Sequence, residues 1–224
     1  MARPANPELR AEILKAATRI VERGGPDRVT MREVAQEVGY SPTTLYLYFK
    51  DKHAILSHVV LEGYDDLAEF CNTAMVGPRL IDKLRQRGRA YVVWGVTHPN
   101  IYRLVFETTL GVDWTSEDGI RMARALTDGV DLLQQAVDSG ELAVDVDARR
   151  RMMIIWAAMH GVTSLAISRR LRTGGAVMGS SEILGLATAL GDEALNDLVA
   201  PYLGATSVLI GYARGEDCSY EGIK

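Results

Sequence analysis

Residues 29–52, "VTMREVAQEVGYSPTTLYLYFKDK", contain the start and end signals of two short helices. Thr30 precedes an apolar-periodic run and is followed three residues later by a glutamate, the pattern of a capping box at a helix start. Gly39 lies where a left-handed residue would close the last turn of that helix. Ser41 and Pro42 then mark a second start, as N-cap and first helical residue. The stretch therefore predicts two short helices joined by a tight turn.

A longer amphipathic helix is predicted before this pair. Between Glu8 and Arg23 the apolar residues recur at three- and four-residue steps, with charged residues on the other face. Three helices with a tight turn between the second and third have the proportions of a helix-turn-helix, whose second helix enters the DNA major groove. Helical hairpins that bind nothing share this spacing, so the spacing alone leaves DNA binding open.

The side chains of the third helix divide into two faces. Leu45 and Phe49 are four residues apart and are predicted to fill the core between the helices. The other face offers hydroxyls and apolar edges suited to phosphates, base edges and thymine methyls, from Thr43, Thr44, Leu47 and Tyr48, with Tyr46 at the flank. The alternative for the two tyrosines is packing against neighbouring helices with their hydroxyls in water.

Fifteen positions between residues 8 and 56 extend this pattern without an insertion. They are Val29-Thr30, Val34-Ala35, Val38-Gly39, Ser41, Thr44-Leu45-Tyr46, Tyr48-Phe49, Lys52 and Ile55-Leu56. These positions resemble the amino-terminal signature of the tetracycline-repressor (TetR) family of bacterial regulators. Thr43 stands where the family often has glycine, and Tyr40 where it often has a smaller apolar residue. These departures leave the operator sequence open.

The resemblance implies roles for individual residues. It assigns DNA contacts to Thr30, Pro42, Thr43, Tyr46, Leu47, Tyr48 and Lys52. Lys52, at the start of the next predicted helix, would meet a phosphate. Together with Thr44, which the helical face alone suggests, these residues are the predicted DNA-binding set.

The rest of the chain is predicted to be helical, which makes the fold class all-α. We expect an amino-terminal three-helix helix-turn-helix DNA-binding domain, residues 1–53, followed by a larger helical ligand-binding and dimerisation domain, residues 54–224. Helices of the second domain are expected at about 55–71, 80–97, 100–110, 117–139, 147–172 and 182–213, with a loop between the last two.

Six aromatic and histidine residues are spaced by four on these predicted helices. They would line a cavity for a small, largely apolar effector, and they are Trp94, His98, Tyr102, Phe106, Trp156 and His160. The same spacing is also typical of a helical core, and His98 beside Pro99 has the alternative role of capping its helix end. The segments "YVVWGVTHPNIYRLVF" and "WAAMHGV" resemble a body type found in a subset of the TetR family, whose body binds a small molecule.

Small residues near the carboxyl end predict a packing surface for another helix. Gly204, Ser207 and Gly211 follow an i, i+3, i+7 spacing. The resemblance implies a homodimer through the helices at about 147–172 and 182–213, as a four-helix interface. A helix of the same chain is an alternative occupant.

Composition limits the other classes of function. The 224-residue chain has a net charge of −4, with an excess of +2 in residues 1–52 and −6 in 53–224. The longest apolar run, 152–167, is shorter than the roughly 18 residues that span a bilayer, so no membrane partner is expected. The chain opens without an apolar run, which predicts a cytoplasmic protein. Cys71 and Cys218 lack metal-ligand spacing, so we expect reduced thiols, no metal and no cofactor.

The expected function is a ligand-responsive transcriptional regulator, a repressor released from double-stranded operator DNA by its effector. A ligand that instead promotes DNA binding is also compatible with the sequence. One alternative is a helical ligand-sensing dimer without DNA binding. The other is an all-helical enzyme, which is disfavoured because His53 and His58 lie on different helical faces and no Ser/His/Asp set is present. We therefore expect no catalytic residues.

Overall fold

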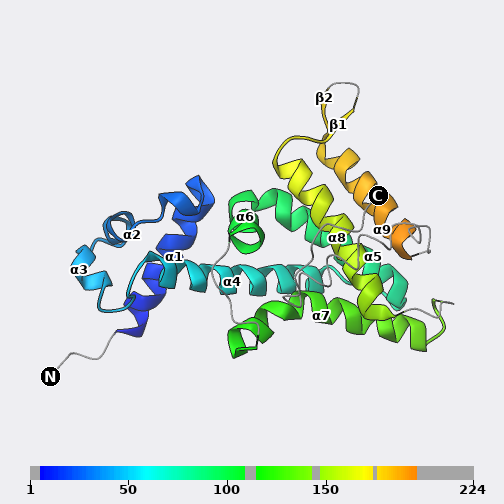
Figure 1. The fold of residues 1–224 in the computed structure, drawn as a ribbon, viewed down its shortest axis with the longest axis horizontal. Coiled ribbons are helices and arrows are strands. Elements are labelled where there is room, and N and C mark those ends of the chain that lie inside the picture. Colours follow the sequence, from blue (N-terminus) through cyan, green and yellow to red (C-terminus); the bar gives the residue numbers. More distant parts are fainter. Residues whose placement is uncertain (1–5, 109–114, 143–146, 174–175, 196–224) are drawn as a thin grey trace, which may run out of the picture. The chain divides into compact units, whose positions relative to one another are not determined.

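The computed structural model describes residues 6–108, 115–142, 147–173 and 176–195 (Figure 1). Within these ranges the regular secondary structure is helical apart from one short hairpin, which confirms the predicted all-α class. In the hairpin, β1 (Arg172–Thr173) pairs antiparallel with β2 (Ala176–Val177). The sequence predicted only the end of a helix and a loop at this place.

The first helix, α1 (Pro7–Gly24), has both of its ends fixed by local signals. The Asn6 side chain accepts a hydrogen bond from the Glu8 amide at 2.9 Å, and a proline follows Asn6 at the first helical position. The helix ends before Gly25, whose φ of 82° is favourable only for glycine. A short 3₁₀ turn, η1 (Pro26–Arg28), then leads to the next helix.

The second helix, α2 (Met31–Val38), begins and ends where predicted. The Thr30 hydroxyl accepts a hydrogen bond from the Glu33 amide at 3.0 Å. Gly39 follows in the left-handed conformation, with φ 75°. The buried side of α2 packs against α1, and Val34 is fully buried there.

The third helix, α3 (Pro42–Leu45), is shorter than predicted. Ser41 caps it by accepting a hydrogen bond from the Thr44 amide at 3.2 Å. After Leu45 the chain continues as turns, in which the amides of residues 48 and 49 donate to the Leu45 carbonyl at 2.9 and 3.0 Å. Asp51 is extended and caps the following helix, so these turns connect α3 to α4.

In the described part of the chain, six further helices follow. Their bounds are α4 (Lys52–Thr73), α5 (Leu80–Thr97), α6 (Pro99–Glu107), α7 (Glu117–Asp138), α8 (Ala148–Ile167) and α9 (Ser180–Leu195). The α5 bounds are as predicted. The α8 helix ends five residues before the predicted residue 172, because Arg169 has a positive φ of 56° that breaks the helix. The predicted continuation of α9 to residue 213, including Gly204, Ser207 and Gly211, lies outside the described residues.

The described residues form two compact units, which we treat separately. The first comprises those within 1–74 and 93–128, and the second those within 75–92 and 129–224. The predicted division into domains 1–53 and 54–224 stays a prediction.

In the first unit, α6 packs against both α1 and α4. Gly63 of α4 makes this possible, since a Cβ there would lie 2.9 Å from Val105 and 3.1 Å from Ile101, both on α6. The Asn100 side chain also donates to the Glu22 carbonyl at the end of α1, at 2.9 Å. The α6 helix is therefore joined to the helix that precedes the helix-turn-helix pair.

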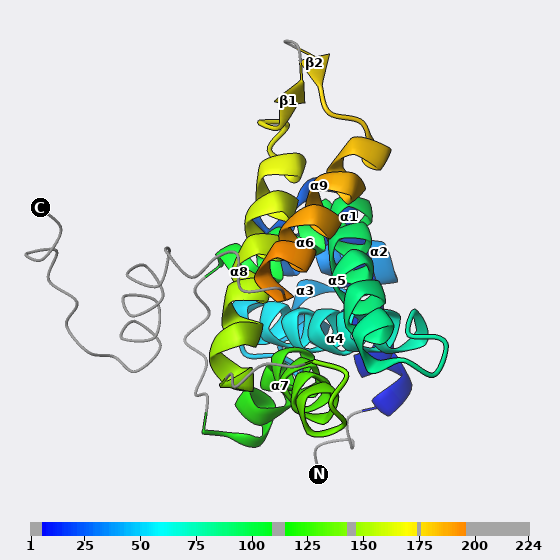
Figure 2. The same ribbon diagram turned by 90° about the vertical axis from the view of Figure 1, so that its right-hand side faces the viewer.

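In the second unit, α8 and α9 lie side by side, as both views show (Figure 2). Met159 of α8 lies against glycines of its neighbours: a Cβ at Gly88 or Gly191 would be 3.7 Å from its side chain. No helix in the described ranges is long and apolar enough to cross a membrane. These ranges also contain no group of three or more His, Cys, Asp or Glu residues placed to hold a metal ion.

Candidate nucleic-acid interface

Residues 41–49, called here the recognition segment, present one buried and one exposed side. Leu45 and Phe49 are 0% and 3% exposed, which confirms their predicted place in the core. Tyr46 and Leu47 are 55% and 76% exposed on the other side. Pro42 and Thr43 are exposed as well. The segment thus exposes apolar and hydroxyl-bearing side chains on one side. On its other side, two core residues anchor it to the rest of the domain.

The two tyrosines of the segment have different surroundings. Tyr48 is half-buried, and its hydroxyl accepts a hydrogen bond from the Asn6 amide at 3.1 Å. Tyr46 is exposed. The alternative of packing against a neighbouring helix therefore fits Tyr48 better than Tyr46, although the sequence placed Tyr46 at the flank of the exposed face. Contact of either tyrosine with DNA stays a prediction.

Two predicted DNA-binding threonines also take part in hydrogen bonds at helix starts. The Thr44 hydroxyl lies 2.9 Å from the Ser41 hydroxyl, and Thr44 is half-buried. Thr30 is exposed and accepts from the Glu33 amide. Because a hydroxyl both donates and accepts, the Thr30 oxygen can still donate its proton to a phosphate. The two roles of Thr30, cap and phosphate contact, are therefore compatible.

Lys52 is the first residue of α4, a helix of 22 residues. Helix N-termini favour anions, because their first amides lack partners within the helix and the helix dipole is positive there. The Asp51 side chain occupies one of these amides by accepting from Ala54 at 2.9 Å. Lys52 thus adds a positive charge at a helix start, which suits the predicted phosphate contact.

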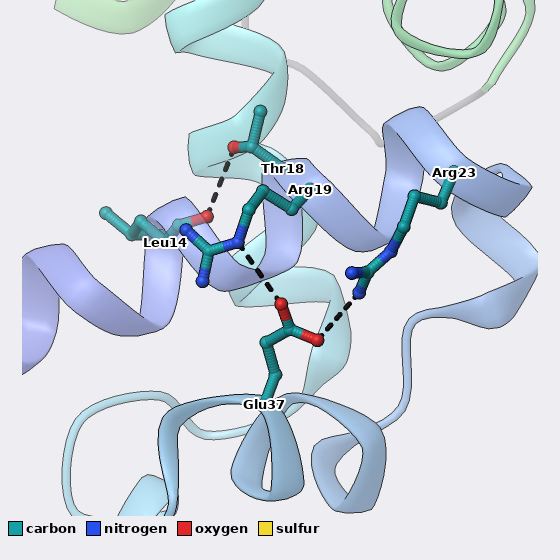
Figure 3. Close-up of polar contacts among 5 residues, drawn as sticks. All are labelled: Leu14, Thr18, Arg19, Arg23 and Glu37. Atoms are coloured by element: carbon teal, nitrogen blue, oxygen red, sulfur yellow. Dashed lines mark hydrogen bonds and ion pairs between the residues drawn. The ribbon is translucent and has the colours of Figure 1, made fainter.

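A pair of arginines on α1 holds α2 in place (Figure 3). The Glu37 carboxylate accepts from Arg19 Nε at 3.2 Å and from Arg23 Nη2 at 2.7 Å. The hydrogen bonds from Arg23 and then Arg19 lower the pKa of Glu37 below its ordinary value, and the bond to Glu37 raises the pKa of Arg23. This contact fixes the helix that precedes the recognition segment.

Sequence reasoning missed two residues of this region. Tyr40, in the turn between α2 and α3, is 49% exposed and extends the exposed surface beside the recognition segment. Asn6 caps α1 and also donates to Tyr48. The Asn6-Pro7 pair is a recognisable helix start, but its contact with residue 48 has no sequence signal.

Of the predicted effector-binding residues, Trp94 and His98 lie in the first unit. Trp94 is 1% exposed, and its indole N–H donates to Asp66 at 2.6 Å. The His98 ring stacks on it at 5.4 Å, and His98 Nδ1 lies 3.0 Å from the Trp94 carbonyl. His98 therefore satisfies a carbonyl at the end of α5, in agreement with the alternative role as a cap.

Tyr102 and Phe106 belong to the same unit. Tyr102 is fully buried, with its ring 4.8 Å from that of Phe106, which in turn meets the edge of Tyr64 at 5.6 Å. Burial raises the pKa of Tyr64 to about 12, as expected in an apolar environment. These contacts describe a packed aromatic cluster between α4 and α6. A role of its members in ligand binding stays a prediction.

Trp156 and His160 lie in the second unit. Their rings are 5.7 Å apart, and His160 Nδ1 lies 3.2 Å from the Tyr91 hydroxyl. The unit also contains two buried arginines, Arg87 and Arg151, which are 8% and 5% exposed. Burial lowers the pKa of Arg151. The six predicted effector-binding residues are thus divided between the two units, four in the first and two in the second.

The fold and this surface define a helix-turn-helix protein. Residues 13–59 match the family of bacterial regulatory proteins named tetR, and residues 84–184 match the tetracyclin repressor-like C-terminal domain. The chain therefore belongs to the TetR family of transcriptional regulators, which confirms the resemblance noted in the sequence.

Individual relatives agree with this assignment. The chain is 36% identical over 56 residues to YfiR of Bacillus subtilis (strain 168), an uncharacterised HTH-type transcriptional regulator; this match spans 25% of the chain and 27% of YfiR. A protein of unknown function from Rhodococcus sp. RHA1 has the same fold, with a TM-score of 0.72, 20% identity, and coverage of 88% of this chain and 98% of that one. The regulator FadR from Bacillus subtilis, solved in complex with stearoyl-CoA, has a TM-score of 0.61 and 17% identity, covering 83% and 97%.

Proposed function

We propose that this protein is a homodimeric repressor that binds double-stranded operator DNA and is released by a small, largely apolar effector. The observation that supports DNA binding most strongly is the recognition segment, with Tyr46 and Leu47 exposed above the buried Leu45 and Phe49. Contiguous exposed apolar surface marks interaction sites, whereas singly exposed apolar residues are common on any protein. A repressor that binds operator DNA would act in the cytoplasm.

The DNA contacts divide into two kinds. Thr43, Tyr46 and Leu47 face outward and would meet base edges in the major groove. Thr30 and Lys52 stand at helix starts and would meet phosphates. Pro42, Thr44 and Tyr48 would contribute from the edges of this surface. Residues 1–53 are the proposed DNA-binding domain, and 54–224 the effector-binding and dimerisation domain.

Dimerisation would pair the helices at about 147–172 and 182–213, of which α8 and α9 are the described parts, with the same elements of a second copy. In the single chain the middle of α8, residues 153–158, is only half-buried although it is rich in apolar side chains, and Leu165 is 42% exposed. Covering this helix in an isologous interface would remove that surface from water. Two recognition segments would then meet successive major grooves, about 34–36 Å apart.

The effector class follows from chemistry and from one neighbour. FadR of Bacillus subtilis was solved with stearoyl-CoA, a molecule with a long apolar chain and a negatively charged headgroup. Within the second unit, Trp156 and His160 would suit the apolar part, and the buried Arg87 and Arg151 would suit a negative group. Long-chain acyl thioesters are therefore the first effectors to test.

A gel shift tests the proposal with DNA from upstream of the protein's own gene, with and without stearoyl-CoA. We expect a discrete complex at low salt that dissociates when the acyl thioester is added. Binding that persists with every acyl chain length would contradict the effector class alone. Failure to bind this DNA, or any duplex selected from a random pool, would instead favour a ligand-sensing dimer without DNA binding.

A further inference from the structure

Three side chains from separate parts of the first unit meet beneath the recognition segment. Arg10 of α1 places its guanidinium carbon 5.1 Å from the centre of the Phe49 ring. Arg10 Nη2 also lies 2.7 Å from His58 Nε2 on α4. The His58 ring in turn meets the edge of the Phe49 ring, with 5.7 Å between centroids. We call these three residues the Arg10 cluster.

The chemistry of the cluster fixes the charge of His58. A guanidinium can only donate hydrogen bonds and stays protonated, so His58 Nε2 must be the acceptor. The imidazole is therefore neutral, with its proton on Nδ1. Burial and then the positive charge of Arg10 lower the pKa of His58.

Other charged groups act on His58 with opposite signs. Asp118 of α7 and Glu62 of α4 raise its pKa, and Arg121 of α7 lowers it. Arg121 is itself paired with Asp65. The net direction remains a lowered pKa, so His58 stays neutral and keeps its contact with Arg10 at the ordinary histidine value of about 6.5. The contact is lost only as the pH falls through the lowered pKa.

The Arg10 cluster contacts the end of the recognition segment, which Asn6 also contacts. Phe49 is the last residue of the recognition segment, and its side chain is 3% exposed on the buried side of the segment. The preceding residue, Tyr48, accepts from the Asn6 amide. The first turn of α1 therefore fixes two consecutive residues of the segment, one through Asn6 and the other through Arg10.

We propose that His58 is a positioning residue for DNA binding: its neutral ring holds Arg10 over Phe49, and its protonation loosens the recognition segment and weakens operator binding. Protonation would turn the Nε2 acceptor into a donor facing another donor, and would place two positive charges in contact. Arg10 would then move away and Phe49 would lose its cation–π partner. This inference rests on the proposed DNA-binding role of the segment.

The experiment compares pH profiles of DNA binding. The probe is a fluorescent duplex recovered from a random pool at pH 8, and anisotropy is measured from pH 8 to 5.5 at constant ionic strength. Wild type should lose affinity on acidification by about three- to tenfold relative to His58→Gln. A difference of one unit in the pKa of His58 between the free and the DNA-bound protein would correspond to about tenfold in affinity. The glutamine keeps an acceptor for Arg10 but does not titrate, so its profile should lack this loss.

Two further variants complete the test. His53→Gln changes an exposed histidine on the same helix and should keep the acid-dependent loss of wild type. Arg10→Met removes the opposing charge but keeps an apolar side chain over Phe49, and should also flatten the profile, which covers the case that His58→Gln does not fold. Circular dichroism establishes that each protein is folded across the pH range.

The outcomes separate the two proposals. Parallel profiles for wild type, His58→Gln and Arg10→Met would overturn the positioning role while leaving DNA binding intact. If no duplex is recovered from the pool, the proposed DNA-binding function fails and this inference fails with it.

Discussion

At the scale of single residues, the two tyrosines of the recognition segment differ in what they contact. The Tyr48 hydroxyl accepts from an amide at the start of α1, whereas Tyr46 is exposed. A side chain that is used within the fold contributes to stability, and one that faces water is available for a partner. Neighbouring residues of one type should therefore respond differently to substitution.

We predict that Tyr48→Phe lowers stability and that Tyr46→Ala does not. Loss of the Tyr48 hydroxyl removes one hydrogen bond, which should lower the free energy of unfolding by about 0.5–1.5 kcal/mol. We expect the lower end of this range, because the bond is exposed to solvent. Tyr46→Ala should change stability by less than about 0.5 kcal/mol but weaken DNA binding. Urea denaturation and anisotropy measure the two effects. Equal destabilisation by both changes would contradict the assignment.

Lys52→Ala should weaken binding to all duplexes alike. A lysine that neutralises one phosphate contributes no base discrimination, and its removal should reduce the slope of log K against log salt by about one unit. Thr43→Val should instead change the preference among duplexes. Binding curves at several salt concentrations distinguish the two, and an unchanged slope for Lys52→Ala would rule out the phosphate contact.

At the scale of elements, helix ends decide where the recognition segment lies. Thr30, Gly39 and Ser41 were predictable because caps depend on residues within four positions of each other. The short α3 was not predicted, because residues 46–51 contain no glycine or proline that would mark its end after Leu45. The contacts of Tyr48 with Asn6 and of Arg10 with His58 join residues more than 40 positions apart. Such contacts depend on tertiary packing and leave no periodic signal in the sequence.

The contact of Glu37 with two arginines predicts a pH-dependent stability. Because the folded state lowers the pKa of Glu37, its contribution is present above the ordinary carboxyl value of 4.5 and is lost as the pH falls through the lowered pKa. Glu37→Gln should therefore be less stable than wild type at pH 7, and the difference should shrink in acid. Urea denaturation at pH 7 and in acid measures the stability difference between the variant and wild type. Glu12→Gln, at an exposed position on α1, is the control. A difference that persists unchanged in acid would contradict the account.

The close approach of α4 and α6 predicts that Gly63→Ala is destabilising. A Cβ at residue 63 would lie 2.9 Å from Val105, so the helices must separate or side chains must shift, at an expected cost of about 1–3 kcal/mol. Gly88→Ala is the matched control in α5, where the nearest atom would be a flexible methionine at 3.7 Å. The control should be neutral or stabilising by up to about 1 kcal/mol. Thermal denaturation of both variants compares them.

At the scale of the whole molecule, the proposed function requires that one chain both bind DNA and respond to an effector. The helix-turn-helix elements and the body match separate parts of the same family of regulators. The sequence predicted this family from a short signature. The residues that contact the proposed effector-binding side chains became visible only in the structure. Trp94 and Tyr102, for example, are almost fully buried.

Anisotropy with a selected duplex tests the central claim, operator binding through the recognition segment, most directly. The measurement compares wild type with a Tyr46→Ala, Leu47→Ala variant at low salt, after circular dichroism has established that both are folded. We predict saturable binding by wild type with two subunits per duplex, and a loss of at least about tenfold in affinity for the variant, since each lost base contact costs about 1–3 kcal/mol. Equal affinities for the two proteins, or no binding by folded wild type, would contradict the account.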